Sequence, residues 1–110
     1  MFSVLQVTEF LASEVVKLER SIKDRIDGGF NESYVRADRE RMTMLCEAAR
    51  MLGWSCDQSR IILKKLPDLE RPKVELFEIT NFLANEAHKV TDVDRKFYSD
   101  AVSKLYLSSK

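Results

Sequence analysis

The sequence predicts an all-α fold: a small helical bundle of four to five helices built on a long N-terminal antiparallel helical hairpin. Apolar residues recur at intervals of three and four through several long segments, which is the period of an amphipathic helix. The three glycines and two prolines of the chain fall between those segments, where helices end. No segment alternates apolar and polar residues as a half-buried strand does. At 110 residues the chain fits a single helical domain, residues 1–110.

The first helix is predicted over Val4–Asp27. Ser3 and Gln6 match a capping box, in which each side chain accepts a hydrogen bond from the backbone N–H of the other residue. Gly28 and Gly29 supply a C-terminal stop, because glycine accepts the left-handed conformation that ends many helices. The expected inward stripe consists of Val4, Leu11, Val15, Leu18, Ile22 and Ile26.

The second helix is predicted over Glu32–Leu52, with Gly53 as its stop. Asn31 is a favourable N-cap, and Phe30 before it is expected to pack on Val35 as a hydrophobic staple. Because only a short turn joins this helix to the first, the two should form the antiparallel hairpin. The expected inward stripe is Val35, Met42, Leu45, Ala49 and Leu52, with Asp38 as a polar exception.

A short third helix is predicted over Asp57–Leu66, stopped by Pro67. Trp54, just before it, is expected to bury a large apolar area and thereby to orient this helix across the hairpin.

The C-terminal third of the chain predicts one or two further helices, packed along the hairpin. A fourth helix runs from Lys73 to about Lys89, with Pro72 in its first turn. Thr91 with the acids after it matches a new helix start, so a fifth helix to about Leu107 is expected. A single helix over 73–107 stays open, because the apolar stripe keeps its phase across Thr91. The expected inward residues are Leu76, Phe77, Ile79, Leu83, Ala87, Val90, Val93, Phe97, Ala101, Val102 and Leu105.

The charge balance and the few reactive side chains argue against catalysis. Lys plus Arg number 18 and so do Asp plus Glu, so no net positive charge draws the chain to nucleic acid or to an anionic membrane. Cys46 and Cys56 match no zinc or redox spacing, and both are expected to be reduced thiols. The single histidine, His88, has no acid and nucleophile placed beside it by a motif. We therefore expect a protein that is not an enzyme and uses no cofactor and no metal.

The N-terminal segment lacks the pattern of a secretion signal. It has no basic start, and Glu9 and Glu14 interrupt the apolar run that a signal requires. No apolar run approaches the roughly 18 residues of a membrane-spanning helix. A cytoplasmic location without membrane association is the expectation.

Several predicted helices carry apolar residues over more than one face, which indicates burial on more than one side. Covering each surplus side chain contributes about 1.5–3 kcal/mol. We therefore expect a helical protein-interaction module of adaptor, chaperone or inhibitor type, which binds another protein and associates with itself as a homo-oligomer. The residues expected to bind the partner are Phe2, Leu5, Phe10, Met44, Met51, Tyr98 and Tyr106.

Residues 48–66 offer an alternative function. An alanine four residues before Gly53, flanking apolar residues and a polar helix start resemble a helix-turn-helix motif. The resemblance implies a DNA-binding transcriptional regulator whose second helix contacts bases and phosphates. The sequence departs from the motif where a buried aliphatic residue should follow the glycine by about six positions. The DNA-contacting residues would be Gln58, Ser59, Arg60, Lys64 and Lys65.

Overall fold

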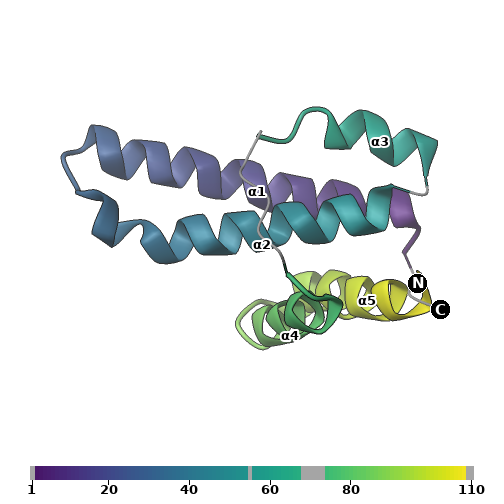
Figure 1. Ribbon diagram of the computed structural model, residues 1–110. Helices are drawn as coiled ribbons and strands as arrows, with labels where there is room; N and C mark the ends of the chain where they lie inside the picture. The colour runs from purple at the N-terminus through teal and green to yellow at the C-terminus, as the bar shows by residue number, and fades with distance from the viewer. Residues whose placement is uncertain (1, 55, 68–73, 109–110) are drawn as a thin grey trace.

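The computed structural model describes residues 2–54, 56–67 and 74–108, and every regular element in those ranges is a helix (Figure 1). The elements are α1 (Val4–Asp27), the 3₁₀ turn η1 (Glu32–Tyr34), α2 (Arg36–Gly53), α3 (Asp57–Leu63), α4 (Leu76–Ala87) and α5 (Asp92–Ser108). The predicted all-α bundle on a long N-terminal hairpin is confirmed.

Helix α1 begins and ends at the predicted residues. The Gln6 N–H donates to Ser3 Oγ at 3.1 Å and the Ser3 N–H donates to Gln6 Oε1 at 2.8 Å, which completes the capping box. After Asp27 the chain turns at Gly29, whose φ of +94° lies in the left-handed region that favours glycine. These local signals fix the length of the first arm of the hairpin.

Helix α2 begins later than predicted. Asn31 does act as a cap, but for the short turn η1, because its side chain accepts the Ser33 N–H at 2.8 Å. The α-helix itself starts at Arg36. Phe30 does not pack against the core as a staple would. Its ring instead lies edge-to-face with Tyr34, with the ring centroids 5.7 Å apart.

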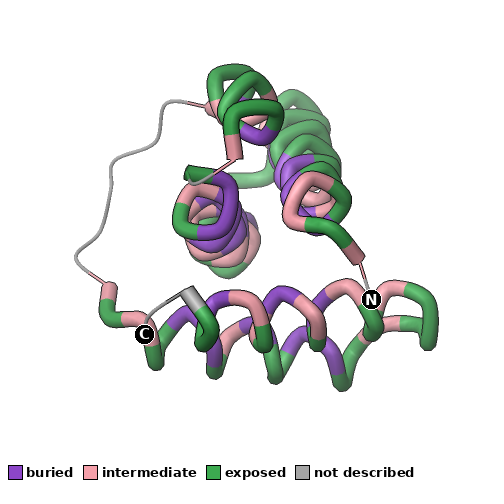
Figure 2. The backbone as a smooth tube through the Cα atoms, turned by 90° about the vertical axis from the view of Figure 1, so that its right-hand side faces the viewer, coloured by how far each residue is buried: buried purple, intermediate pink, exposed green. Residues whose placement is uncertain are grey.

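The remaining helices cover two opposite faces of the α1–α2 hairpin (Figures 1 and 2). Helix α3 lies on one face. Helices α4 and α5 form a second hairpin on the other face and cross the first, since Figure 2 shows α1 and α2 end-on while α4 and α5 are seen along their length. The predicted packing of the C-terminal helices along the hairpin is therefore wrong in direction. A crossing arrangement leaves the turn between α1 and α2 protruding beyond the other helices (Figure 1).

The corner predicted near Thr91 is confirmed, because α4 ends at Ala87 and α5 begins at Asp92. Arg95 stabilises this corner. Its backbone N–H donates to the Thr91 carbonyl at 2.8 Å, and its side chain donates to the Ala87 carbonyl at 3.0 Å. The carbonyls at the end of α4 thereby gain a partner that the helix itself does not supply. Pro72 and the predicted start of α4 at Lys73 lie outside the described residues.

The core follows the α1–α2 hairpin and continues beneath both α3 and the C-terminal hairpin. It is formed by the predicted stripes, with Leu11, Val15, Leu45, Ile79 and Leu83 among the fully buried residues. Two inward predictions in the C-terminal hairpin are wrong, because Phe77 and Val93 are mostly exposed. The direction in which α4 and α5 cross α1 and α2 turns these two positions towards solvent.

Candidate functional site

Three of the predicted partner-binding residues are used inside the subunit, where α1 meets α5. The Phe97 ring stacks on Phe2 with centroids 4.0 Å apart and on Phe10 at 4.5 Å. Phe10 also lies edge-to-face with Tyr98, which is buried. The Phe2 N–H donates to the Asp100 carboxylate at 3.1 Å. The packing of α5 therefore accounts for most of the wide apolar face at the start of α1. Tyr98 is a core residue and does not belong to an exposed surface.

The other predicted partner-binding residues are scattered. Leu5 and Met44 are half-buried, and Met44 packs against the core. Tyr106 on α5 is about half exposed and its hydroxyl lies 3.5 Å from the Thr80 hydroxyl on α4. Met51 is partly exposed near the end of α2. The predicted set is therefore not one continuous surface, since Met51 lies near the exposed Trp54 at the end of α2 and Tyr106 lies next to the exposed Leu107 on α5.

Three exposed apolar side chains belong to the corner between α2 and α3. Trp54 is 71% exposed, the largest value among the exposed large apolar residues of the described chain. Met51 lies one helical turn before it, and Ile61 lies on the outward side of α3. The prediction that Trp54 is buried and orients α3 is wrong. We call Met51, Trp54, Arg60 and Ile61 the Trp54 surface.

Gly53, and not Trp54, sets the position of α3. A Cβ atom on Gly53 would lie 3.1 Å from Ser59 Cβ and 3.2 Å from Thr8 Cγ2. Any Cβ at position 53 would require these neighbours to shift by a few tenths of an ångström, so glycine favours the close approach of α3 to the end of α2 and the start of α1. Arg50 secures the far end of the α3 segment, since its guanidinium donates to the Pro67 carbonyl at 3.2 Å. The contacts of Gly53 and Arg50 hold α3 against α1 and α2 without using the Trp54 side chain, which remains exposed.

Arg60 contacts both the backbone and the indole ring of Trp54. Its Nε donates to the Trp54 carbonyl at 2.7 Å, and its guanidinium carbon lies 5.2 Å from the centroid of the Trp54 ring. That distance is within the range of a cation–π interaction. Arg60 also forms an ion pair with Asp57 at 3.2 Å. The exposed tryptophan is thus partly ordered before any partner binds.

The predicted DNA-contacting residues divide into two groups. Gln58, Arg60, Lys64 and Lys65 are all exposed on the outward side of α3 and the turn after it. Ser59 is fully buried against Gly53, so it is not available to a base edge. Ser59 therefore stands where the helix-turn-helix pattern expects a buried aliphatic residue, and the close packing on Gly53 accepts its small side chain.

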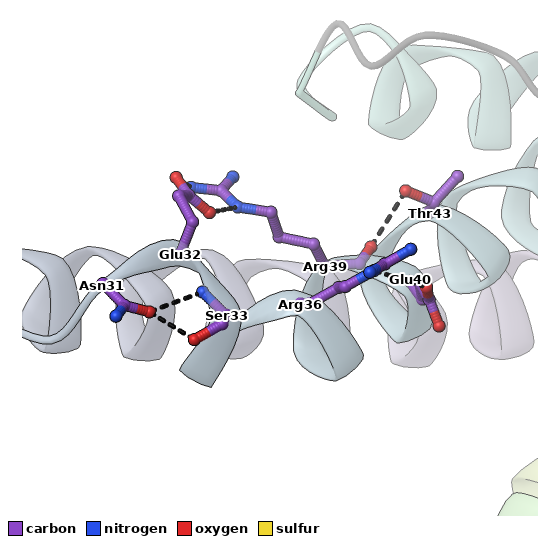
Figure 3. A network of polar contacts seen from close by, with 7 residues as sticks. All are labelled: Asn31, Glu32, Ser33, Arg36, Arg39, Glu40 and Thr43. Carbon is purple, nitrogen blue, oxygen red and sulfur yellow. Dashed lines mark hydrogen bonds and ion pairs between the residues drawn. The ribbon is translucent and has the colours of Figure 1, made fainter.

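A second exposed aromatic pair, Phe30 and Tyr34, lies at the protruding turn of the hairpin. Polar contacts link the residues that follow Phe30 in the chain (Figure 3): Arg39 binds Glu32 through two hydrogen bonds of 2.8 Å, and Arg36 pairs with Glu40 at 3.6 Å. The hydrogen bonds from Arg39 lower the pKa of the Glu32 carboxyl. The charges at this turn are satisfied by one another, so the network explains how the turn is held rather than what it binds.

The reactive side chains lie apart from one another. Burial raises the pKa of the Cys46 thiol to about 11, which leaves it protonated at neutral pH. Among the described residues, no group of three His, Cys, Asp or Glu side chains is arranged to hold a metal ion. None of the helices in the described part of the chain is both long and apolar enough to cross a membrane.

The comparisons with known proteins gave no match: no family model, no curated protein and no solved structure resembles this chain.

Proposed function

We propose that this protein is a non-enzymatic protein-interaction module of adaptor, chaperone or inhibitor type, which binds its partner through the Trp54 surface. One observation carries the proposal: a tryptophan 71% exposed at a helix corner, with an arginine stacked on it. An indole left in water costs the apolar transfer free energy that a partner would recover. In this proposal the Trp54 surface takes the place of the scattered residues that the sequence predicted to bind the partner.

The types of residue in this surface support the proposal. Tryptophan and arginine are enriched among the few interface residues that contribute most of the binding free energy. A side chain that is already held in one position loses less conformational entropy when it is covered. Arg60 restrains Trp54 through both its guanidinium and the backbone hydrogen bond at residue 54. An exposed but restrained Trp54 is therefore suited to be an interface anchor.

The experiment compares two exposed aromatic residues in different places. Wild-type protein, Trp54→Ala and Phe77→Ala would each be immobilised and incubated with lysate of the source cell, and the retained proteins identified and quantified. Phe77 is the matched control, since it is 60% exposed on α4, away from the corner. We expect specific proteins that Phe77→Ala retains and Trp54→Ala loses. Equal retention by both variants would contradict the proposal.

Self-association is part of the same proposal, with a second copy of the chain as a partner. Exposed apolar residues also lie on α5, at Val93, Tyr106 and Leu107, and support this expectation. Sedimentation velocity over a concentration series reports it directly. A sedimentation coefficient that rises with concentration is expected, and a monomer at all concentrations would remove self-association.

A DNA-binding regulator is the second candidate, because Gln58, Arg60, Lys64 and Lys65 share the outward side of the α3 segment. Such a protein would lose affinity for duplex DNA on Arg60→Ala and Lys64→Ala, and in higher salt. A titration with mixed-sequence duplex DNA at low salt that shows no binding would reject this candidate.

A further inference from the structure

We propose that the partner segment seated on the Trp54 surface is an acidic amphipathic helix. This inference rests on the proposed function and adds the chemistry of the partner to it. Three features of the surface carry it: its apolar centre, the sign of the charges beside that centre, and the helical shape of the elements that present it.

The exposed apolar side chains of this corner are Trp54, at the end of α2, and Ile61, on α3. Ile61 is 59% exposed on the outward side of α3. On a helix, the side chains nearest to a residue on the surface are those three and four positions away. By this spacing the neighbours of Ile61 are Asp57 and Gln58 before it and, just after the end of α3, Lys64 and Lys65, all of them exposed. An aliphatic side chain placed before two lysines favours a partner with an apolar stripe bordered by acids.

The local charge is positive although the whole chain is neutral. In residues 56–67 the bases are Arg60, Lys64 and Lys65, and the only acid is Asp57. Asp57 is already paired with Arg60 at 3.2 Å. No ion pair involves Lys64 or Lys65 within the described part of the chain. Two lysines at the edge of an apolar surface attract carboxylates and repel a basic partner.

The shape favours a helix as the occupant. The surface is the outward side of α3 together with the last turn of α2, and it has the ridges of side chains three and four residues apart into which another helix packs. Within residues 2–54, 56–67 and 74–108 there is no strand, and so no sheet edge to which an extended peptide could add. An amphipathic helix presents apolar residues at matching spacing, and acids on its flanks would reach the lysines.

Trp54 makes the test direct, because it is the only tryptophan in the chain. Its fluorescence emission shifts to shorter wavelength when a ligand covers the indole. The full chain would be titrated with a synthetic 18-residue peptide that carries Leu and Phe at helical spacing and Glu at all other positions. A second peptide with Lys in place of every Glu is the charge control, and a mixed-sequence DNA duplex is the nucleic-acid control.

We expect the acidic peptide to shift the Trp54 emission and to bind more weakly as NaCl rises, and the lysine peptide to cause no shift. The double variant Lys64→Glu/Lys65→Glu should weaken binding about fivefold or more, since two attractive pairs become repulsive. The matched control is Lys23→Glu/Lys96→Glu, which makes the same change in net charge at exposed lysines on α1 and α5 and should leave affinity unchanged.

Three results would overturn this inference: equal binding of both peptides, no shift with either, or a shift caused by the DNA duplex alone. None of these decides the proposed function, which depends on whether Trp54→Ala loses proteins that Phe77→Ala retains. Loss of lysate partners on Trp54→Ala combined with no peptide binding would reject the acidic helix and keep the interaction surface. If Trp54→Ala and Phe77→Ala retain the same lysate proteins and the acidic peptide still binds, the proposed function is rejected. The preference of the surface for an acidic helix would then still stand.

Discussion

Arg41 on α2 holds the buried carboxylate of Glu86 on α4 through two hydrogen bonds, of 2.9 Å from Nη2 and 3.2 Å from Nε. The Glu86 side chain is only 3% exposed and that of Arg41 is 38% exposed. A buried carboxylate is stabilised only if a partner offsets the loss of its hydration. This pair therefore joins the N-terminal hairpin to the C-terminal hairpin and fixes where α4 crosses α2.

Removing one member of this pair should cost more than removing both. Arg41→Met leaves the Glu86 carboxylate buried with only the distant Lys89, at 3.9 Å, and should lower the free energy of unfolding by about 2–3 kcal/mol. The double variant Arg41→Met/Glu86→Leu should recover at least half of that loss, because no charge is then left buried. Urea unfolding measures both. A double variant less stable than Arg41→Met would show that the pair does not act in this way.

The stacked rings at the start of α1 should contribute to the stability of the isolated subunit. Phe97→Ala removes the ring that contacts both Phe2 and Phe10, and should lower the free energy of unfolding by about 2–3 kcal/mol. Phe77→Ala is the control and should change it by less than about 0.5 kcal/mol, because Phe77 is mostly exposed. Equal effects in thermal unfolding of the monomer would mean that the Phe2 and Phe10 face is not covered by α5.

Gly53→Ala should destabilise the corner beneath Trp54. The added Cβ would lie 3.1–3.3 Å from side-chain atoms of Ser59, Thr8 and Leu63, on two other helices. The crowding should outweigh the higher helix propensity of alanine and lower the free energy of unfolding by about 1 kcal/mol. Amide hydrogen exchange should become faster in α3 and remain unchanged in α4. A more stable variant with unchanged exchange would contradict the packing described for the corner.

The two thiols should differ in reactivity and in their effect on stability at high pH. Cys46 is fully buried and its pKa is raised to about 11, whereas Cys56 is only half-buried. At pH 8 a thiol reagent should label Cys56 in the native protein and Cys46 only after unfolding.

Because the unfolded chain releases the Cys46 proton near its ordinary pKa of 9.0, the contribution of this group is complete below pH 9 and is lost as the pH rises towards about 11. The slope is at most about 1.4 kcal/mol per pH unit. Cys46→Ala should show a smaller decrease in stability between pH 9 and pH 10. Burial raises the pKa of Tyr98 as well and adds a decrease of the same sign, which the Cys46 variant retains. An identical pH dependence in both proteins would contradict the assignment to Cys46.

Local signals made much of the fold predictable. The Ser3 and Gln6 capping box and the glycines after Asp27 fixed both ends of α1, because these interactions lie within a few residues of one another. The corner at Thr91 was left open by the pattern. It depends on the Arg95 side chain reaching the end of the preceding helix, a contact that a continuous apolar stripe does not reveal.

The candidate surface was less predictable, because it depends on how the helices cross. Trp54, Phe77 and Val93 were expected inside as large apolar residues, yet all three are mostly exposed. Conversely, Phe10 and Tyr98 were expected on a surface, yet Phe10 packs against Phe97 and Tyr98 of α5, and Tyr98 is buried. Ser59 is buried because Gly53 allows a close approach, a relation between two helices that the spacing in the chain does not express.

Site-specific photo-crosslinking in living cells tests the central claim most directly. A photoreactive benzoylphenylalanine would replace Gln58, which is exposed next to the Trp54 surface, or Lys23, which is exposed on α1 as the control. The account predicts a discrete crosslinked partner from position 58 that is absent when Trp54→Ala is added, and none from position 23. Crosslinks from position 58 that persist with Trp54→Ala, or that arise equally from position 23, would contradict it.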